Sequence, residues 1–184
     1  MKNSIIWSIM KKSKTLYLTV VNGEQWCSDG RQAYNISSLP ELTPEQFIAM
    51  IGVETGKSAE YNCRSNDNID TAIYPESDNY IEEEAEPCLI NICSANGELV
   101  PLFAFGEVCF IPAKSLKPFS DDAAELRFFV RKQGDVYSIV IKIGMLQVGI
   151  VMPVKISTFI IDAVSRLHDA LTAEDQISEV DVPY

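Results

Sequence analysis

Two dipeptides, Asn22-Gly23 and Asp29-Gly30, constrain the fold of this chain more than any other feature of its sequence. Both favour the tight turns that join antiparallel strands, because asparagine, aspartate and glycine tolerate a positive φ. Strand-forming residues flank the two dipeptides at 15–21, 24–28 and 31–36. We therefore predict an antiparallel β-meander over this part of the chain.

The segments on either side of this meander predict a further strand and a helix. Residues 4–10 (SIIWSIM) are apolar and rich in strand formers, so we expect a strand there. Thr43-Pro44-Glu45-Gln46 is typical of a helix start, because threonine can cap the first turn and glutamine can close a capping box. Gly52 is expected to end this helix.

The second half of the chain shows the same pattern of elements without the same residues. Strands are predicted at 88–94, 99–105 and 107–112, and a second meander at 126–132, 136–144 and 145–152. Beyond Pro153, apolar residues at helical spacing predict a helix over 157–171. These patterns indicate an α+β fold, with antiparallel β-meanders in two related halves and two main helices.

We interpret 1–184 as a single domain, because its length suits one hydrophobic core. The first meander and helix occupy 1–56, and the second meander and helix occupy 88–171. Between them, 57–87 is poor in apolar residues and rich in turn formers, so we predict an acidic surface excursion with one short strand near 58–64. Residues 172–184 form an acidic tail.

Charge is distributed very unevenly along the chain. The net charge is −11, yet basic and acidic residues balance over 1–60 and over 88–171. The whole excess therefore lies in 61–87, with −7, and in 172–184, with −4. A protein that binds nucleic acid by broad neutralisation of phosphates is expected to be basic, so the composition argues against that class.

The acidic segment is the candidate partner-binding site. Clustered carboxylates raise the rate of encounter with a basic surface, and neighbouring aromatic rings supply contact area. A basic surface that normally holds DNA or RNA is a natural target, with carboxylates in place of phosphates. The alternative is that these charges only keep the protein soluble. The residues assigned to the site are Asp78, Tyr80, Glu82, Glu83, Glu84 and Glu86.

The sequence contains no recognisable catalytic or metal-binding set. His168 is the single histidine, and none of the five cysteines forms a C-x-x-C pair, so we expect buried, reduced thiols. The segment 52–58 resembles a P-loop, but it is one residue short and follows a helix instead of a strand. We therefore expect no enzymatic activity, no cofactor and no metal.

The N-terminal segment does not have the order of a signal peptide, because Lys11, Lys12 and Lys14 interrupt its apolar runs. No run approaches the ~20 apolar residues that span a bilayer. We expect a cytoplasmic protein of a host bacterial cell that does not bind membranes. Phe103, Phe105 and Phe110 lie in a strand-rich region and leave a homodimer contact open.

Three segments resemble a phage family that includes a type II anti-CRISPR inhibitor: EQWCSDGRQAYNISSLPELTPEQF, VCFIPAKSLKPFSD and VYSIVIKIGMLQVGIVMPVKI. The resemblance lies in pattern and spacing and covers most of the chain. It implies a non-enzymatic phage protein that binds a type II CRISPR RNA-guided nuclease, with or without guide RNA, and blocks its engagement or cleavage of DNA. The acidic segment fits this role, because such nucleases hold nucleic acid in positively charged channels.

Two shorter segments are similar to the bacterial sliding clamp: 27–31 (CSDGR) to its strand–turn motif and 111–116 (IPAKSL) to its helix start. This similarity implies a distantly clamp-like fold, and an alternative function as a phage DNA-replication accessory protein. A clamp needs several repeated domains and a basic inner face, from which one chain of net charge −11 departs unless it oligomerises. A small enzyme is the remaining alternative.

Overall fold

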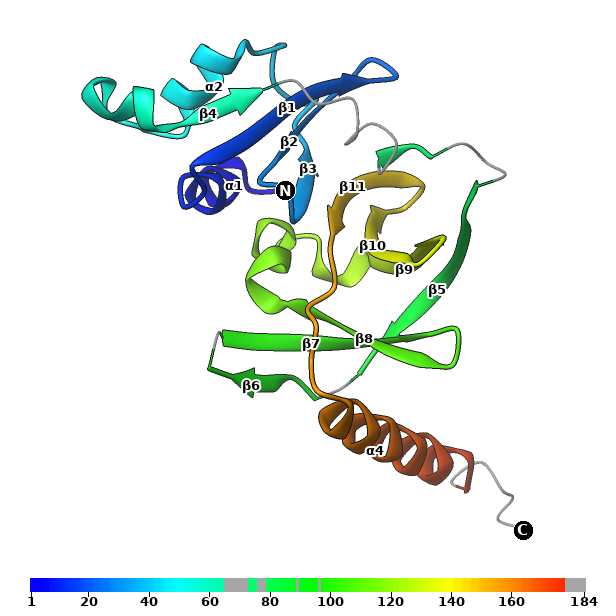
Figure 1. Ribbon diagram of the computed structural model, residues 1–184. Helices are drawn as coiled ribbons and strands as arrows, with labels where there is room; N and C mark the ends of the chain where they lie inside the picture. The colour runs from blue at the N-terminus through cyan, green and yellow to red at the C-terminus, as the bar shows by residue number, and fades with distance from the viewer. Residues whose placement is uncertain (65–72, 76–78, 89, 96, 178–184) are drawn as a thin grey trace.

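The protein has an α+β fold, as predicted, in which helices accompany a large, mostly antiparallel sheet (Figure 1). The computed structural model describes residues 1–64, 73–75, 79–88, 90–95 and 97–177. In chain order, its elements are α1 (Asn3–Met10), β1 (Thr15–Val21), β2 (Glu24–Ser28), β3 (Gln32–Asn35), α2 (Pro44–Met50), η1 (Thr55–Glu60), β4 (Asn62–Arg64), β5 (Ile81–Pro87), β6 (Ile92–Ser94), β7 (Gly97–Ala104), β8 (Glu107–Pro112), η3 (Ala113–Phe119), η4 (Ala123–Glu125), β9 (Leu126–Gln133), β10 (Val136–Ile143), β11 (Leu146–Val151) and α4 (Thr158–Ile177).

The first meander is confirmed, and its two turns have the chemistry that the sequence predicts. Asn22 and Gly23 have φ values of 52° and 81°, and they join β1 to β2 with Val21 opposite Glu24. Gly30 has a φ of 83° in the turn between β2 and β3. In the same turn, the Asp29 carboxylate accepts hydrogen bonds from the backbone N–H groups of Arg31 and Gln32. The meander is therefore specified locally, by its turns.

The predicted strand at 4–10 is wrong, because these residues form the helix α1. Ile6 and Met10 are one helical turn apart and both are fully buried, while the Trp7 ring packs edge-on against Phe47 at 5.7 Å. An apolar run of this length has no periodicity that separates a strand from a helix. The helix is selected by burial of one face against the rest of the fold, which overrides the local strand preference.

The helix α2 begins with the predicted capping box. The Thr43 hydroxyl accepts a hydrogen bond from the Gln46 backbone N–H at 3.3 Å, and the Gln46 side-chain oxygen accepts one from the Thr43 backbone N–H at 2.9 Å. Pro44 occupies the first helical turn, where its missing N–H has no consequence. The chain leaves the helix through Gly52, whose φ is 75°.

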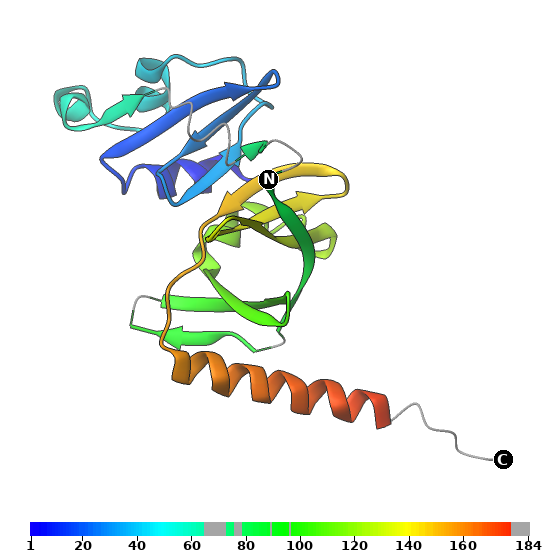
Figure 2. The ribbon, with the colours of Figure 1, turned by 45° about the vertical axis from the view of Figure 1, so that its right-hand side comes forward.

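The two meanders lie side by side in mirror order. The sheet runs β4-β1-β2-β3-β11-β10-β9-β5-β7-β6, and β8 pairs with β7 (Figure 2). The strands β3 and β11 pair antiparallel, with Tyr34 opposite Gly149, so the third strand of one meander meets the third strand of the other. The helix α1 precedes the first meander and η3 precedes the second, and the Lys2 backbone N–H donates a hydrogen bond to the Pro118 carbonyl across them.

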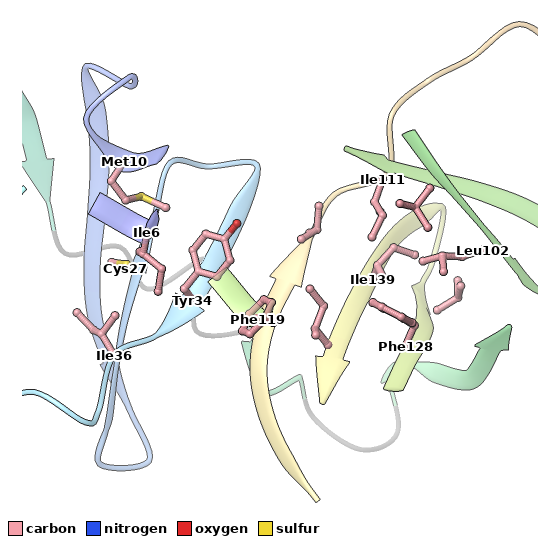
Figure 3. Close-up of a cluster of buried hydrophobic side chains, with 14 of the residues drawn as sticks. Ile6, Met10, Cys27, Tyr34, Ile36, Leu102, Ile111, Phe119, Phe128 and Ile139 are labelled. Carbon is pink, nitrogen blue, oxygen red and sulfur yellow. The ribbon is translucent and has the colours of Figure 1, made fainter. Parts of the chain in front are cut away.

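One cluster of buried side chains extends through both meanders. Ile6 and Met10 of α1 and Tyr34 of the first meander belong to it, as do Phe119 of η3 and Ile139 of the second meander (Figure 3). The Tyr34 and Phe119 rings lie 5.9 Å apart, and the Tyr34 hydroxyl lies 3.0 Å from the Ser115 carbonyl oxygen. Burial raises the pKa of Tyr34, because a phenolate would be desolvated there. The Tyr34 side chain is therefore enclosed where the two meanders meet.

The helix α4 is longer than the 157–171 predicted for it, and it extends away from the body of the protein in both views (Figures 1 and 2). Val164 packs with Phe110 in a second cluster under the helix, and the His168 ring stacks on Phe103 at 3.7 Å between centroids. Phe105 is half-buried in the turn between β7 and β8. Phe103 and Phe110 therefore pack against α4, and the homodimer contact stays a prediction.

The junction between β3 and β11 is tightly packed around Gly149. A Cβ there would lie 3.1 Å from the tip of the buried Phe119 ring and 3.5 Å from the Ala33 carbonyl oxygen. We expect Gly149→Val to lower the free energy of unfolding by about 1–3 kcal/mol, as overpacking of a core does. Urea denaturation measures this change. The control is Gly56→Val, where a Cβ meets nothing within 4 Å, and equal losses in the two variants would contradict close packing at the junction.

Candidate functional site

The acidic segment 81–87 forms a strand inside the sheet, so the predicted surface excursion over 57–87 is wrong for these residues. The strand β5 pairs antiparallel with β9, placing Glu82 opposite Arg131 and Glu84 opposite Phe129. Its end pairs with β7, through Glu86 and Pro87. The short strand expected near 58–64 is β4, which follows the 3-10 helix η1. Asp78 lies outside the described residues.

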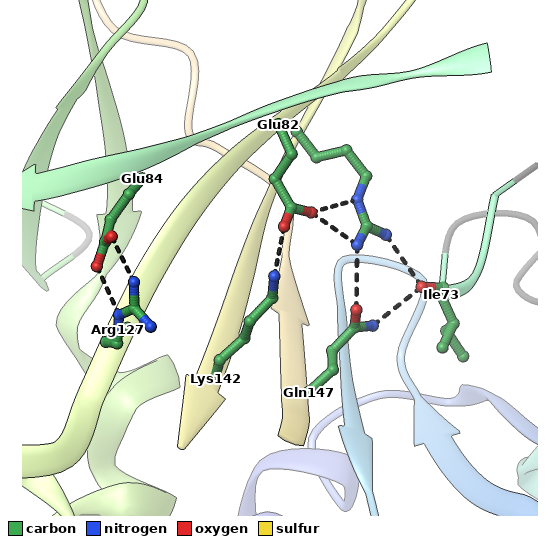
Figure 4. A network of polar contacts seen from close by, with 7 residues as sticks. Ile73, Glu82, Glu84, Arg127, Lys142 and Gln147 are labelled. Atoms are coloured by element: carbon green, nitrogen blue, oxygen red, sulfur yellow. Dashed lines mark hydrogen bonds and ion pairs between the residues drawn. The ribbon is translucent and has the colours of Figure 1, made fainter. Parts of the chain in front are cut away.

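Glu82 is held by two cations of its own chain. Its carboxylate lies 2.8 Å from an Arg131 guanidinium nitrogen and 2.5 Å from Lys142 Nζ (Figure 4). Arg131 is only 5% exposed, and its guanidinium also donates hydrogen bonds to the Ile73 carbonyl and to the Gln147 side-chain oxygen. A buried guanidinium needs this anion, because an uncompensated charge in the interior is strongly unfavourable. Glu82 therefore neutralises an internal cation.

The remaining site residues have different surroundings. Glu84 is half exposed and forms two hydrogen bonds with Arg127, which lowers the pKa of its carboxyl group. The Glu83 carboxylate accepts a hydrogen bond from the Phe105 backbone N–H at 2.7 Å. Glu86 is exposed. The strand thus separates its acids: Glu82 and Glu84 are paired with cations, whereas Glu83 and Glu86 carry their charge toward solvent.

Tyr80 belongs to the same network as Glu82. Its ring lies 4.9 Å from the Arg131 guanidinium carbon, on the chain just before β5 begins. An aromatic face over a guanidinium adds a cation–π attraction to the ion pair. Of the proposed site residues, the structure brings together Tyr80 and Glu82 around one buried cation. These contacts stabilise the pairing of β5 with β9.

A mostly apolar groove is the better candidate for a binding surface, and the sequence analysis did not identify it. The groove has a volume of about 550 Å³ and lies between β8, the start of β10 and the segment 152–156. Val136 is 55% exposed at its edge, and Met152 and Val154 are each 37% exposed. We name it the apolar groove, and its lining includes Val108, Phe110, Val136, Tyr137, Val154 and Ile161. Apolar hollows of this size accept hydrophobic side chains of a ligand or partner.

The cysteines and the histidine do not assemble into a reactive group in the described part of the chain. All five thiols are free, and the described residues contain no group of three or more His, Cys, Asp or Glu placed to hold a metal ion. Burial raises the pKa of Cys63 to about 11, and it also raises the pKa of Cys27. Cys93 is exposed, which differs from the expectation that all five thiols are buried.

The comparisons with known proteins give no family for this chain. No family model matches the sequence, and no curated protein or solved structure matches it either. The similarities to the phage inhibitor family and to the sliding clamp therefore stay predictions. Within the described residues, no helix has both the length and the apolar character needed to cross a membrane.

The network around Arg131 predicts a graded response to loss of the acids on β5. Glu82→Ala would remove the carboxylate that pairs with a guanidinium only 5% exposed, so we expect a loss of about 3–5 kcal/mol in the free energy of unfolding. Glu86→Ala is the matched control and should change the free energy of unfolding very little, because that side chain is exposed. Urea denaturation of both variants distinguishes a structural role from a docking role. A stable Glu82→Ala protein would contradict the structural role.

The thiol environments predict which cysteines react in the folded protein. Because the pKa of Cys63 is raised to about 11, its thiolate fraction at pH 8 is about a thousandth, and its alkylation should accelerate as the pH rises toward that value. Cys93 is exposed and should be alkylated first at pH 8, with Cys27 protected until the protein unfolds. Peptide mapping by mass spectrometry after brief iodoacetamide treatment tests this order. Labelling in urea is the control, since all five thiols should then react. Equal rates at Cys63 and Cys93 in the folded protein would be inconsistent with the structure.

Proposed function

We propose that this chain acts by binding another protein, and that the partner is a type II RNA-guided DNA nuclease whose engagement or cleavage of DNA it blocks. The class of partner rests on the resemblance of three segments to the phage family that includes an anti-CRISPR inhibitor. The observation that carries the binding role is the apolar groove, whose rim exposes Val136, Met152 and Val154 to solvent. Exposed apolar surface around a hollow is typical of protein–protein contact sites.

The apolar groove can supply affinity in a way that the acids of β5 cannot. Burial of apolar area is worth about 25 cal/mol per Å² removed from water, so an apolar side chain of the partner that fills the groove would contribute appreciably to binding. Glu82 is committed to Arg131 and Lys142, and Glu84 is committed to Arg127. These two carboxylates are therefore not the docking surface, and the protein docks through the apolar groove.

The charge of the whole chain retains a role in the approach to the partner. A net charge of −11 accelerates encounter with a surface that carries positive charge to hold nucleic acid, and this effect weakens as salt is added. Glu83 and Glu86 contribute to that field without a cation partner among the described residues. In this proposal, charge sets the association rate and the apolar groove sets the lifetime of the complex.

Two exposed apolar residues at opposite ends of β10 provide a matched test. Val136, 55% exposed, lines the apolar groove, whereas Met145, 90% exposed, lies in the turn after β10 and does not. We expect Val136→Asp to weaken binding to the purified nuclease–guide complex about tenfold, since a buried unpaired carboxylate is unfavourable. Met145→Asp should bind as the unaltered protein does. Biolayer interferometry measures the affinity, and a DNA-cleavage assay measures inhibition.

The two assays test the identity of the partner and the location of the binding surface independently. Full cleavage of DNA in the presence of saturating protein, without detectable binding, would reject the nuclease as the partner. Binding that survives Val136→Asp unchanged, or that is lost equally with Met145→Asp, would remove the apolar groove from the interface while leaving the nuclease as partner. Thermal unfolding of both variants shows that each remains folded.

A further inference from the structure

We propose that this chain also binds the phosphate backbone of nucleic acid, in a groove beside α1 and η3. The hollow has a volume of about 480 Å³, and Lys12, Arg31, Lys114 and Lys117 line it with a single carboxylate, that of Asp29. These charged groups give the groove a local charge of +3 in a protein whose net charge is −11. The inference does not depend on the proposed nuclease partner.

The geometry of η3 directs two of the lysines to the same side. Lys114 and Lys117 are three residues apart in a 3-10 helix, which has three residues per turn, so their side chains lie one above the other. Both are exposed, while Pro118 and Phe119 on the other side of η3 are buried in the core. Packing of η3 against the sheet therefore holds a pair of ammonium groups toward the hollow.

The other two cations come from the first half of the chain. Lys12 follows the end of α1, and Arg31 lies in the turn between β2 and β3. The Asp29 carboxylate is occupied within that turn, because it accepts hydrogen bonds from the Arg31 and Gln32 backbone N–H groups and from the Gln32 side-chain amide. Pairing of β3 with β11 and the contact of α1 with η3 bring residues from both halves to one groove.

Within the part of the chain that the structure describes, these cationic groups lack protein partners, in contrast to most cations elsewhere on the surface. Lys2, Lys14 and Lys57 each have a carboxylate oxygen within 2.8 Å. Among the described residues, the charged ends of Lys12, Arg31, Lys114 and Lys117 have no ion pair or hydrogen bond. Like charges left together repel each other, and a bound polyanion would relieve that repulsion.

The groove extends beyond the first hollow. A second hollow of about 430 Å³ continues it, because the two share Asp29, Arg31, Gln32 and Lys114. The second hollow adds Lys155 and borders the apolar groove, with which it shares Met152, Pro153, Val154 and Lys155. We name the two hollows together the cationic groove. No aromatic side chain is among the described residues that line it, so it offers no platform for stacking bases. The expected contact is with phosphates and is independent of base sequence.

Fluorescence anisotropy with the purified full chain, in the absence of any nuclease, tests this inference. The probes are a labelled DNA duplex of about 20 base pairs and its separate strand, each measured between about 50 and 200 mM salt. We expect binding whose log Kobs falls with log salt with a slope of about −3 to −4, as for four neutralised phosphates. Binding of the duplex alone, of the single strand alone or of both supports the inference and identifies the form of nucleic acid.

Two double variants with the same change in net charge distinguish binding in the cationic groove from non-specific electrostatic attraction to the whole protein. Lys114→Gln with Lys117→Gln should weaken binding about tenfold or more at low salt and reduce the salt slope by about 2. The control, Lys57→Gln with Lys132→Gln, removes two positive charges outside the cationic groove and should change affinity less than about twofold.

Two results would overturn the inference: absence of binding to either probe at the lowest salt, or equal losses in the two double variants. Because no nuclease is present, either result leaves the proposed nuclease partner unaffected. Failure of nuclease binding, in turn, leaves this measurement unaffected.

Discussion

The ion pair between Arg131 and Glu82 is the interaction on which the central part of the sheet depends. The guanidinium is almost fully buried and reaches the Glu82 carboxylate on β5, the Gln147 amide on β11 and the Ile73 carbonyl in the segment before β5. It thereby fixes β5 beside β9, and β5 is the strand that connects the two meanders to the hairpin β7–β8. A strand rich in glutamate is tolerated there because Ala85 is its only buried residue, while Glu82 and Glu84 on its other face are paired with cations.

Pairing of β3 with β11 determines where the surfaces of the molecule lie. It places α1 and η3 next to each other, and it leaves the basic residues that follow or belong to them on one side of the junction. The second meander, to which β11 belongs, contributes Val136 and Tyr137 at the start of β10 to the apolar groove. Two surfaces of opposite chemistry therefore arise from one sheet, one cationic at the junction and one apolar beside α4.

What could be predicted from the sequence was the part of the fold that is specified locally. The Asn22-Gly23 turn and the Thr43 capping box are determined by residues within four positions of each other, and both were identified. The helix α1 was missed because only distant partners, such as Phe47, distinguish it from a strand. The strand β5 was missed for the same reason, since the cations that satisfy Glu82 and Glu84 lie 43 to 60 residues later in the chain.

The candidate surfaces show why charge counted along the chain is a poor guide to charge in space. Over 1–60 and over 88–171 the basic and acidic residues balance, so neither segment suggests a cationic surface. In the fold, carboxylates bind Lys2, Lys14 and Lys57. Lys12, Arg31, Lys114 and Lys117 converge from both segments, and no carboxylate of the described residues pairs with them. Two of the carboxylates in the acidic segment 61–87, those of Glu82 and Glu84, form ion pairs with Arg127, Arg131 and Lys142. The long-range field of the protein is thus negative while its groove is positive, so a polyanion would be repelled at a distance and held only at contact.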